Sequence, residues 1–284
     1  MKSSHFLADA WRSLRRNPLF IIASCLIVLI ALAALFPKLF TRTDPFYCTL
    51  DNSLDPARPG HPFGFDMQGC DIYARVIYGT RTSVFIGLMT SLVTALIGGI
   101  IGTIAGFFGG WVDSLLSRIT DIFFALPLLL GAIVILQMFK NQGAAWKIIL
   151  VMSLFGWVSE ARIARGAVIE TKNQEYNMAS AALGSSAVRN LTHHIIPNSL
   201  APIIVTATTS LGTYIVLEAT LSFLGLGLPS SSISWGADIS SGKDLLRTTS
   251  ASVLFYPSAA LALTVLAFIM MGDAVRDALD PHQK

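Results

Sequence analysis

The sequence predicts an all-α integral membrane protein with six transmembrane helices. Hydrophobic residues make up 53% of the 284-residue chain and charged residues only 13%, with a mean hydropathy of +0.63. A water-soluble domain carries about a quarter charged residues, so this chain has too few charges to cover a soluble surface. Its apolar runs lack the ten-residue alternation of an outer-membrane barrel, and a helix satisfies its backbone groups within one segment. Helices are therefore favoured over strands.

Six charge-poor stretches are candidate spans, since crossing a hydrocarbon core of about 30 Å takes roughly 20 residues of helix. The fourth is the least apolar, because it becomes polar at Glu160. Pro127 lies inside the third and predicts a kink there. In chain order the stretches lie at residues 19–41, 81–113, 121–140, 146–160, 189–218 and 247–273.

Basic residues before the first stretch predict the orientation, because Lys and Arg tend to stay on the cytoplasmic side. Residues 1–18 are then a cytoplasmic segment, and six crossings return the C-terminus to that side. Residues 42–80 become an extracytoplasmic loop, and residues 81–284 a five-helix core with a cytoplasmic loop at about 169–197. The charge pattern is mixed, with Lys2, Arg12, Arg15 and Arg16 inside but Lys38, Arg42, Arg58, Arg75, Lys243 and Arg247 outside.

The predicted outer loop is rich in Pro and Gly and is expected to be irregular. Its end, Asp71–Gly79, spaces apolar residues at helical intervals and predicts a short interfacial helix leading into the second span. Cys48 and Cys70 both fall in this loop, outside the reducing cytosol, where a disulfide can persist. The sequence leaves open whether they are bonded, because it gives no distance between them.

Gly98, Gly102 and Gly106 recur every fourth residue in the second predicted span. One face of that helix therefore lacks side chains, which lets a neighbouring helix approach closely. Such faces occur in helical bundles of every function, so the pattern predicts a packing role.

Residues 170–197 form a polar, charged island between two hydrophobic stretches. A connection of about 25 residues is long for a compact bundle, and such connections are usually functional or disordered. Small and apolar residues at helical intervals predict a short amphipathic helix, which Gly184 ends. Such a helix suits a groove on another protein, and the alternative is a helix lying flat on lipid headgroups. The residues with this spacing are Tyr176, Met178, Ala179, Ala182 and Leu183.

This segment resembles the cytoplasmic signature of bacterial ATP-binding-cassette (ABC) importer permeases. Gly184 follows Ala179 by five residues and Pro197 follows thirteen later, although the usual first and last elements of the signature are replaced. Further stretches resemble the dipeptide and oligopeptide permease family, and the resemblance spans nearly the whole chain. Cys70 stands where many relatives have Arg, which removes a charge and favours the disulfide. The stretches are His61–Asp71, Tyr78–Arg81, Gly109–Asp113, Leu217–Gly227, Ser234–Gly236 and Gly272–Pro281.

The resemblance implies a type I ABC importer permease fold in the bacterial cytoplasmic membrane. It implies a pore shared with a homologous second permease, two cytosolic ATPase subunits, and an extracytoplasmic solute-binding protein that delivers a peptide for alternating-access transport. ATP and Mg²⁺ would be bound by the partner subunits, with no cofactor in this chain and no nucleic acid. The short helix would be the coupling helix in a cleft of one ATPase. The residues expected to carry this contact are Glu175, Tyr176, Met178, Ala179, Ala182, Leu183, Gly184 and Pro197.

No catalytic or metal-binding motif is predicted. Gly236–Lys243 differs from a phosphate-binding loop in its glycine spacing and in the Asp that follows the lysine. His193 and His194 are adjacent, so they do not share one helix face, and no further ligand pair completes a metal site. The energy for transport is therefore expected to come from a partner.

Two questions stay open at this level. Glu218, in or at the end of the fifth span, is costly in lipid and is expected either to line the translocation path or to pair with an arginine. The alternatives to an ABC importer are a self-sufficient channel or an ion-coupled secondary transporter, which would need charges deep in its helices and an internal repeat. Within the family, the cargo could instead be a nickel chelate, haem or glutathione.

Overall fold

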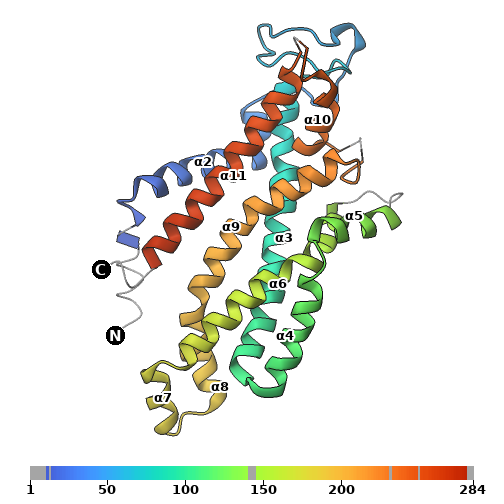
Figure 1. Ribbon diagram of the computed structural model, residues 1–284. Coiled ribbons are helices and arrows are strands. Elements are labelled where there is room, and N and C mark those ends of the chain that lie inside the picture. Colours follow the sequence, from blue (N-terminus) through green and yellow to red (C-terminus); the bar gives the residue numbers. More distant parts are fainter. Residues whose placement is uncertain (1–10, 13, 140–144, 230–231, 249, 280–284) are drawn as a thin grey trace.

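The computed structural model describes residues 11–12, 14–139, 145–229, 232–248 and 250–279. Every regular element of these residues is helical, apart from isolated β-bridges within residues 48–71, and this confirms the predicted class. Figure 1 shows long helices packed side by side, with a short helix at one end and an irregular segment at the other. Most of the predicted segment 1–18, including Lys2, lies outside the described residues.

Within the described residues, four helical stretches are long and apolar enough to cross a membrane, and a bent pair of helices counts as a fifth if it forms one span. The predicted fourth span corresponds to α6 (Ala145–Lys172), which is as long but is not among them because it carries too many charged residues. The stretches are α2 (Pro18–Leu35), α3 (Ile72–Phe108), the run of α8 (Ala187–Asn190), η3 (Leu191–Ile195) and α9 (Ile196–Phe223), α11 (Ser252–Leu279), and the bent pair α4 (Gly110–Phe124) with α5 (Leu128–Met138).

The helix α3 is a single helix of 37 residues. Asp71 caps its first turn by accepting a hydrogen bond from the backbone N–H of Ala74 at 2.9 Å. The predicted interfacial helix at 71–79 therefore continues into the span without a break. The helix ends at Gly109, whose φ of +67° turns the chain into α4.

The helices α3, α6 and α9 form the centre of the bundle, and the glycine face of α3 packs on α6. A Cβ atom built on Gly98 would lie 2.5 Å from Cβ of Glu160, and one on Gly102 would lie 2.3 Å from the carbonyl oxygen of Ala161. A Cβ on Gly106 would lie 2.8 Å from the carbonyl oxygen of Arg165. The three glycines thus allow a backbone contact that any side chain would prevent, as their spacing predicts.

The helices α4 and α5 meet at a bend of 75°. Pro127 is the N-cap residue of α5, so the expected kink is present and lies between two helices. Two ion pairs hold α4 against α6. Asp113 accepts hydrogen bonds from Arg165 at 2.5 and 2.6 Å, and Asp121 accepts one from Arg162 at 2.9 Å.

The end of the molecule opposite the short helix α7 carries the irregular segment before α3 and the short helix α10 (Trp235–Gly242), as Figure 1 shows. Cys48 and Cys70 in this segment are joined by a disulfide with a Cα–Cα distance of 4.2 Å. The helix α2 packs on α11 and α3 through small residues, and its apolar side chains on the other side are exposed. Such a surface suits contact with lipid tails.

Candidate functional site

The predicted short helix is present as α7 (Glu175–Ala182), at one end of the bundle between α6 and α8 (Figure 1). It ends as the sequence indicates. Gly184 adopts a φ of +85°, and the N–H of Ser185 donates to the carbonyl oxygen of Ser180 at 3.1 Å. This bond and one from the N–H of Gly184 to the carbonyl oxygen of Ala181 at 3.0 Å satisfy carbonyls at the end of the helix, and the left-handed conformation explains the glycine.

Polar side chains attach α7 to the rest of the chain. Asn177 is buried, and its side-chain amide donates to the carbonyl oxygen of Thr171 in α6 at 2.5 Å. Ser180 donates to the side-chain oxygen of Asn190 in α8 at 2.8 Å. Sequence reasoning missed Asn177 and Ser180 because it looked for apolar periodicity. Their spacing of three residues, on one helix face, is the signal that was available.

The apolar side chains of α7 point outward. Tyr176 is 47% exposed, Met178 57% and Leu183, which follows the helix, 90%. Val188 in α8 adds a further exposed apolar side chain at 70%. The helix therefore presents an apolar surface at the tip of the molecule, which is unusual unless another surface covers it.

Seven of the eight predicted coupling residues lie on α7 or directly after it, and all seven are exposed. Pro197 is separate from them, because it stands in the first turn of α9 after α8 and the π-helical turn η3. The structure thus brings the α7 residues together and places Pro197 where α9 begins.

Glu218 is completely buried between α9 and α3. Its carboxylate accepts hydrogen bonds from Ser222 at 2.8 Å and from Ser83 in α3 at 3.1 Å. The partners of Glu218 are therefore two serines. The structural alternative expected from the sequence was an arginine. A second buried carboxylate, Glu160 in α6, accepts a hydrogen bond from Ser210 in α9 at 3.0 Å.

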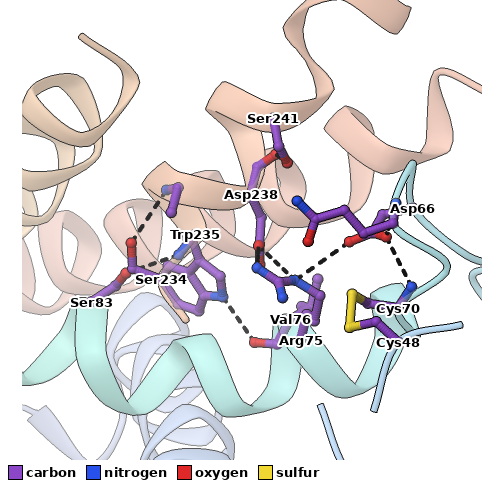
Figure 2. A network of polar contacts seen from close by, with 12 residues as sticks. Cys48, Asp66, Cys70, Arg75, Val76, Ser83, Ser234, Trp235, Asp238 and Ser241 are labelled. Atoms are coloured by element: carbon purple, nitrogen blue, oxygen red, sulfur yellow. Dashed lines mark hydrogen bonds and ion pairs between the residues drawn. A yellow bond between two sulfur atoms is a disulfide. The ribbon is translucent and has the colours of Figure 1, made fainter. Parts of the chain in front are cut away.

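A polar network lies at the α10 end of the bundle, and Figure 2 shows Arg75 between two carboxylates. Arg75 donates to Oδ1 of Asp238 from Nε at 2.8 Å and from Nη2 at 2.5 Å, and its Nε lies 3.7 Å from Oδ2 of Asp66. Burial raises the pKa of Asp238 to about 6, because the loss of hydration outweighs the opposing effect of Arg75. Sequence reasoning included Asp66 in a resembling stretch but did not connect these residues.

Two further segments were considered as nucleotide or metal sites from the sequence. Gly236 and Lys243 lie on α10 and the adjoining 3₁₀ turn, so this segment is helical where a phosphate-binding loop would not be. Within the described part of the chain, His, Cys, Asp and Glu form no group of three or more that could hold a metal ion.

An apolar helical bundle with a short, exposed helix at its end is consistent with a membrane permease subunit. Residues 98–284 match the family described as "Binding-protein-dependent transport system inner membrane component", and residues 5–58 match the "N-terminal TM domain of oligopeptide transport permease C". The chain belongs to this family of binding-protein-dependent inner-membrane transport components, which confirms the resemblance to ABC importer permeases. Membership places it in the inner membrane as a multi-pass protein.

Individual relatives agree with this assignment. The chain is 42% identical to the oligopeptide transport system permease protein OppC of Bacillus subtilis (strain 168) over 280 residues, covering 99% of this chain and 91% of the relative. It is 37% identical to the dipeptide transport system permease protein DppC of the same organism over 280 residues, covering 98% and 87%. The methionine ABC transporter MetNI has a chain of similar fold, with a TM-score of 0.61 at 16% identity, covering 72% of this chain and 96% of that one.

Proposed function

We propose that this chain is the transmembrane subunit of an ATP-driven importer that moves di- or oligopeptides across the cytoplasmic membrane by alternating access. The observation that carries the proposal is the α7 surface, where exposed Met178 and Leu183 stand on a helix anchored by the buried Asn177. Peptide cargo is supported by the names of the two Bacillus relatives. A nickel chelate, haem or glutathione is the weaker alternative.

The proposed topology has six spans, with both termini in the cytoplasm. The span that completes the six is α6, the fourth in chain order; its Arg162 and Arg165 pair with Asp121 and Asp113 of α4. Its buried Glu160 accepts a hydrogen bond from Ser210 of α9. Paired charges of this kind are tolerated at membrane depth when they face other helices. In this topology residues 1–18 are cytoplasmic, 19–41 are the first span, 42–80 are extracytoplasmic, and 81–284 are the permease core with its coupling loop at about 169–197.

The proposed coupling role follows from how α7 is attached. Asn177 ties α7 to the end of α6, and Ser180 ties it to α8, which continues into α9. A force on the exposed face of α7 is therefore passed to two helices of the central bundle. ATP binding drives transport only if it favours one permease conformation over another, and this rigid attachment supplies the link. The surface in contact with the ATPase is formed by Glu175, Tyr176, Met178, Ala179, Ala182, Leu183 and Gly184, with Pro197 at the base of α9.

The proposed partners are a homologous second permease, two cytosolic ATPase subunits that bind ATP and Mg²⁺, and an extracytoplasmic solute-binding protein. No catalytic site and no cofactor are assigned to this chain. Glu218 enters the translocation path only in a conformation in which Ser83 and Ser222 separate from its carboxylate.

A self-sufficient channel or ion-coupled carrier is the second candidate. Peptide uptake by vesicles that hold this chain alone, without nucleotide, would establish it.

The experiment that tests the coupling surface replaces Met178 by Asp in the assembled transporter. Because Met178 is exposed, its replacement leaves the internal packing intact while placing a charge in the proposed contact. We expect loss of co-purifying ATPase subunits and of ATP-dependent peptide uptake. The matched control is Phe46→Asp, which alters an equally exposed side chain at the other end of the molecule and should keep the ATPases bound. Normal ATPase binding by Met178→Asp would contradict the proposal.

A further inference from the structure

The disulfide at the α10 end fixes a turn that carries a carboxylate. Oδ1 of Asp66 accepts hydrogen bonds from the backbone N–H of Gln68 at 2.8 Å and of Cys70 at 2.9 Å. The backbone N–H of Asp66 in turn donates to the carbonyl oxygen of Cys70 at 3.0 Å. The backbone of Cys70 therefore forms two hydrogen bonds with Asp66, and its sulfur is bonded to that of Cys48.

One arginine connects this turn to α10. The second carboxylate oxygen of Asp66, Oδ2, faces Arg75. Arg75 in turn donates two hydrogen bonds to Asp238 in the first turn of α10 (Figure 2). Asp238 is 5% exposed, and its Oδ2 has no hydrogen-bond partner among the described residues. A buried carboxylate that loses its paired cation is strongly destabilising, so the position of Arg75 determines whether α10 keeps its place.

The helix α10 is also in close contact with the central bundle. The indole N–H of Trp235 donates to the carbonyl oxygen of Val76 in α3 at 2.9 Å. A Cβ on Gly236 would lie 2.6 Å from Cα of Ala219 in α9, so the two backbones touch. Ala219 directly follows the buried Glu218. A displacement of α10 would therefore disturb the junction of α3 and α9.

We propose that the Cys48–Cys70 disulfide is a redox-sensitive latch that holds α10 in place through Asp66 and Arg75. Arg75 is the positioning residue of this latch, since its guanidinium lies against Asp66 of the disulfide-closed turn and donates to Asp238 of α10. The inference rests on the proposed function for its effect on transport. In the proposed topology the latch lies on the extracytoplasmic side of the membrane, away from the reducing cytosol. Disulfides persist on that side.

Only one of the two cysteines of the disulfide is accessible to a reductant in solution. Cys48 is exposed, whereas Cys70 is completely buried. A thiolate of an external dithiol attacks Sγ of Cys48, the S–S bond breaks, and Cys70 leaves as a thiolate that takes up a proton. The second thiol of the reductant then displaces Cys48 from the mixed disulfide. Two protein thiols and one oxidised, cyclic reductant result.

The test uses the assembled transporter in lipid nanodiscs and vesicles, with Cys25 replaced by Ser so that the third cysteine does not react. Dithiothreitol should increase amide hydrogen exchange in residues 235–242 but not in residues 175–182, and should lower peptide uptake several-fold. Reoxidation should restore both. A Cys48→Ser, Cys70→Ser double variant should show the lowered uptake with or without reductant.

A second variant tests the route through Arg75. Arg75→Gln keeps the disulfide but loses the charge, so it should show raised exchange in α10 that reductant does not increase further. The matched control is Arg58→Gln, which removes an exposed arginine that pairs with Asp55 outside the network and should stay sensitive to reductant. Unchanged exchange in α10 after verified reduction, or a full response of Arg75→Gln, overturns the latch. Absence of peptide uptake by the unmodified transporter would contradict the proposed function alone, because the exchange measurement still tests the latch.

Discussion

Asn177 donates its side-chain amide to the carbonyl oxygen of Thr171 at 2.5 Å, which joins the buried face of α7 to the end of α6. The carbonyl lies in the last turn of α6, past the regular bonds of that helix, and it also accepts a hydrogen bond from the backbone N–H of Gln174 at 3.2 Å. This bond makes the exposed helix a rigid extension of a central helix. It is the contact on which the proposed transmission of force most depends.

Replacing Asn177 by Ala should uncouple ATP hydrolysis from transport. Loss of one neutral hydrogen bond costs about 1 kcal/mol, which is too little to unfold the bundle but enough to loosen α7. We expect retained ATPase activity with strongly reduced peptide uptake in reconstituted vesicles. Asn173→Ala, at an exposed position just before α7, is the control and should transport normally. Tight coupling in Asn177→Ala would show that the anchor is dispensable.

The glycine face of α3 provides a matched pair of substitutions. Gly98→Ala should destabilise the protein by about 1–3 kcal/mol, because the new Cβ would overlap Glu160 and the carbonyl oxygen of Trp157, each 2.5 Å away. Gly99→Ala meets nothing within 4 Å and should be neutral or slightly stabilising, since alanine favours helix. Thermal unfolding in detergent measures both, and equal midpoints for the two variants would refute the close contact.

The surroundings of Glu218 predict different results for two substitutions. Glu218→Gln keeps an oxygen that can accept from Ser83 or Ser222, so folding and the KM for peptide should change little. Glu218→Ala leaves both hydroxyls without this acceptor and opens a cavity, which should cost about 2–5 kcal/mol. Unfolding midpoints and uptake kinetics check this. A greatly raised KM in a well-folded Glu218→Gln variant would instead indicate direct contact with cargo.

Asp238 predicts a pH dependence of stability. Its pKa is raised from 3.8 to about 6 by burial, so the folded protein binds this proton more tightly than the unfolded chain does. The contribution to stability is fully present below pH 3.8 and is lost as the pH rises through 6. The unfolding midpoint of the wild type should therefore fall relative to that of Asp238→Asn between pH 4 and pH 7. A difference that stays constant, or that grows in favour of the wild type, would contradict the raised pKa.

Much of the fold can be predicted from local patterns, and the failures have identifiable causes. The helix α7 and its end at Gly184 follow from spacing and backbone preference. Which face is buried does not, because periodicity groups residues on one side without saying what covers them. The face that carries Met178 was expected to meet another surface, and it is exposed in the structure, whereas the burial of Asn177 on the opposite side was not predicted.

The outer network shows a different limit. Arg75 and Asp238 are 163 positions apart, so no local pattern links them. The sequence marks Cys48 and Cys70 as a candidate disulfide but leaves their pairing open. It gives no sign that Asp66 forms hydrogen bonds with both the backbone N–H and the carbonyl oxygen of Cys70. The same limit applies to the charged residues of α6, because their partners lie far away in the sequence, in α4 and α9.

The length of α3 bears on how cargo would arrive. Its 37 residues extend about 55 Å, whereas the hydrocarbon layer is about 30 Å thick. In the proposed topology the excess length of the helix extends beyond the bilayer on the extracytoplasmic side, with Arg75 in its first turn and the disulfide-closed segment beside that end. In that topology the proposed solute-binding protein would meet this segment before it reached the lipid surface, so delivery would begin at a height set by one unbroken helix.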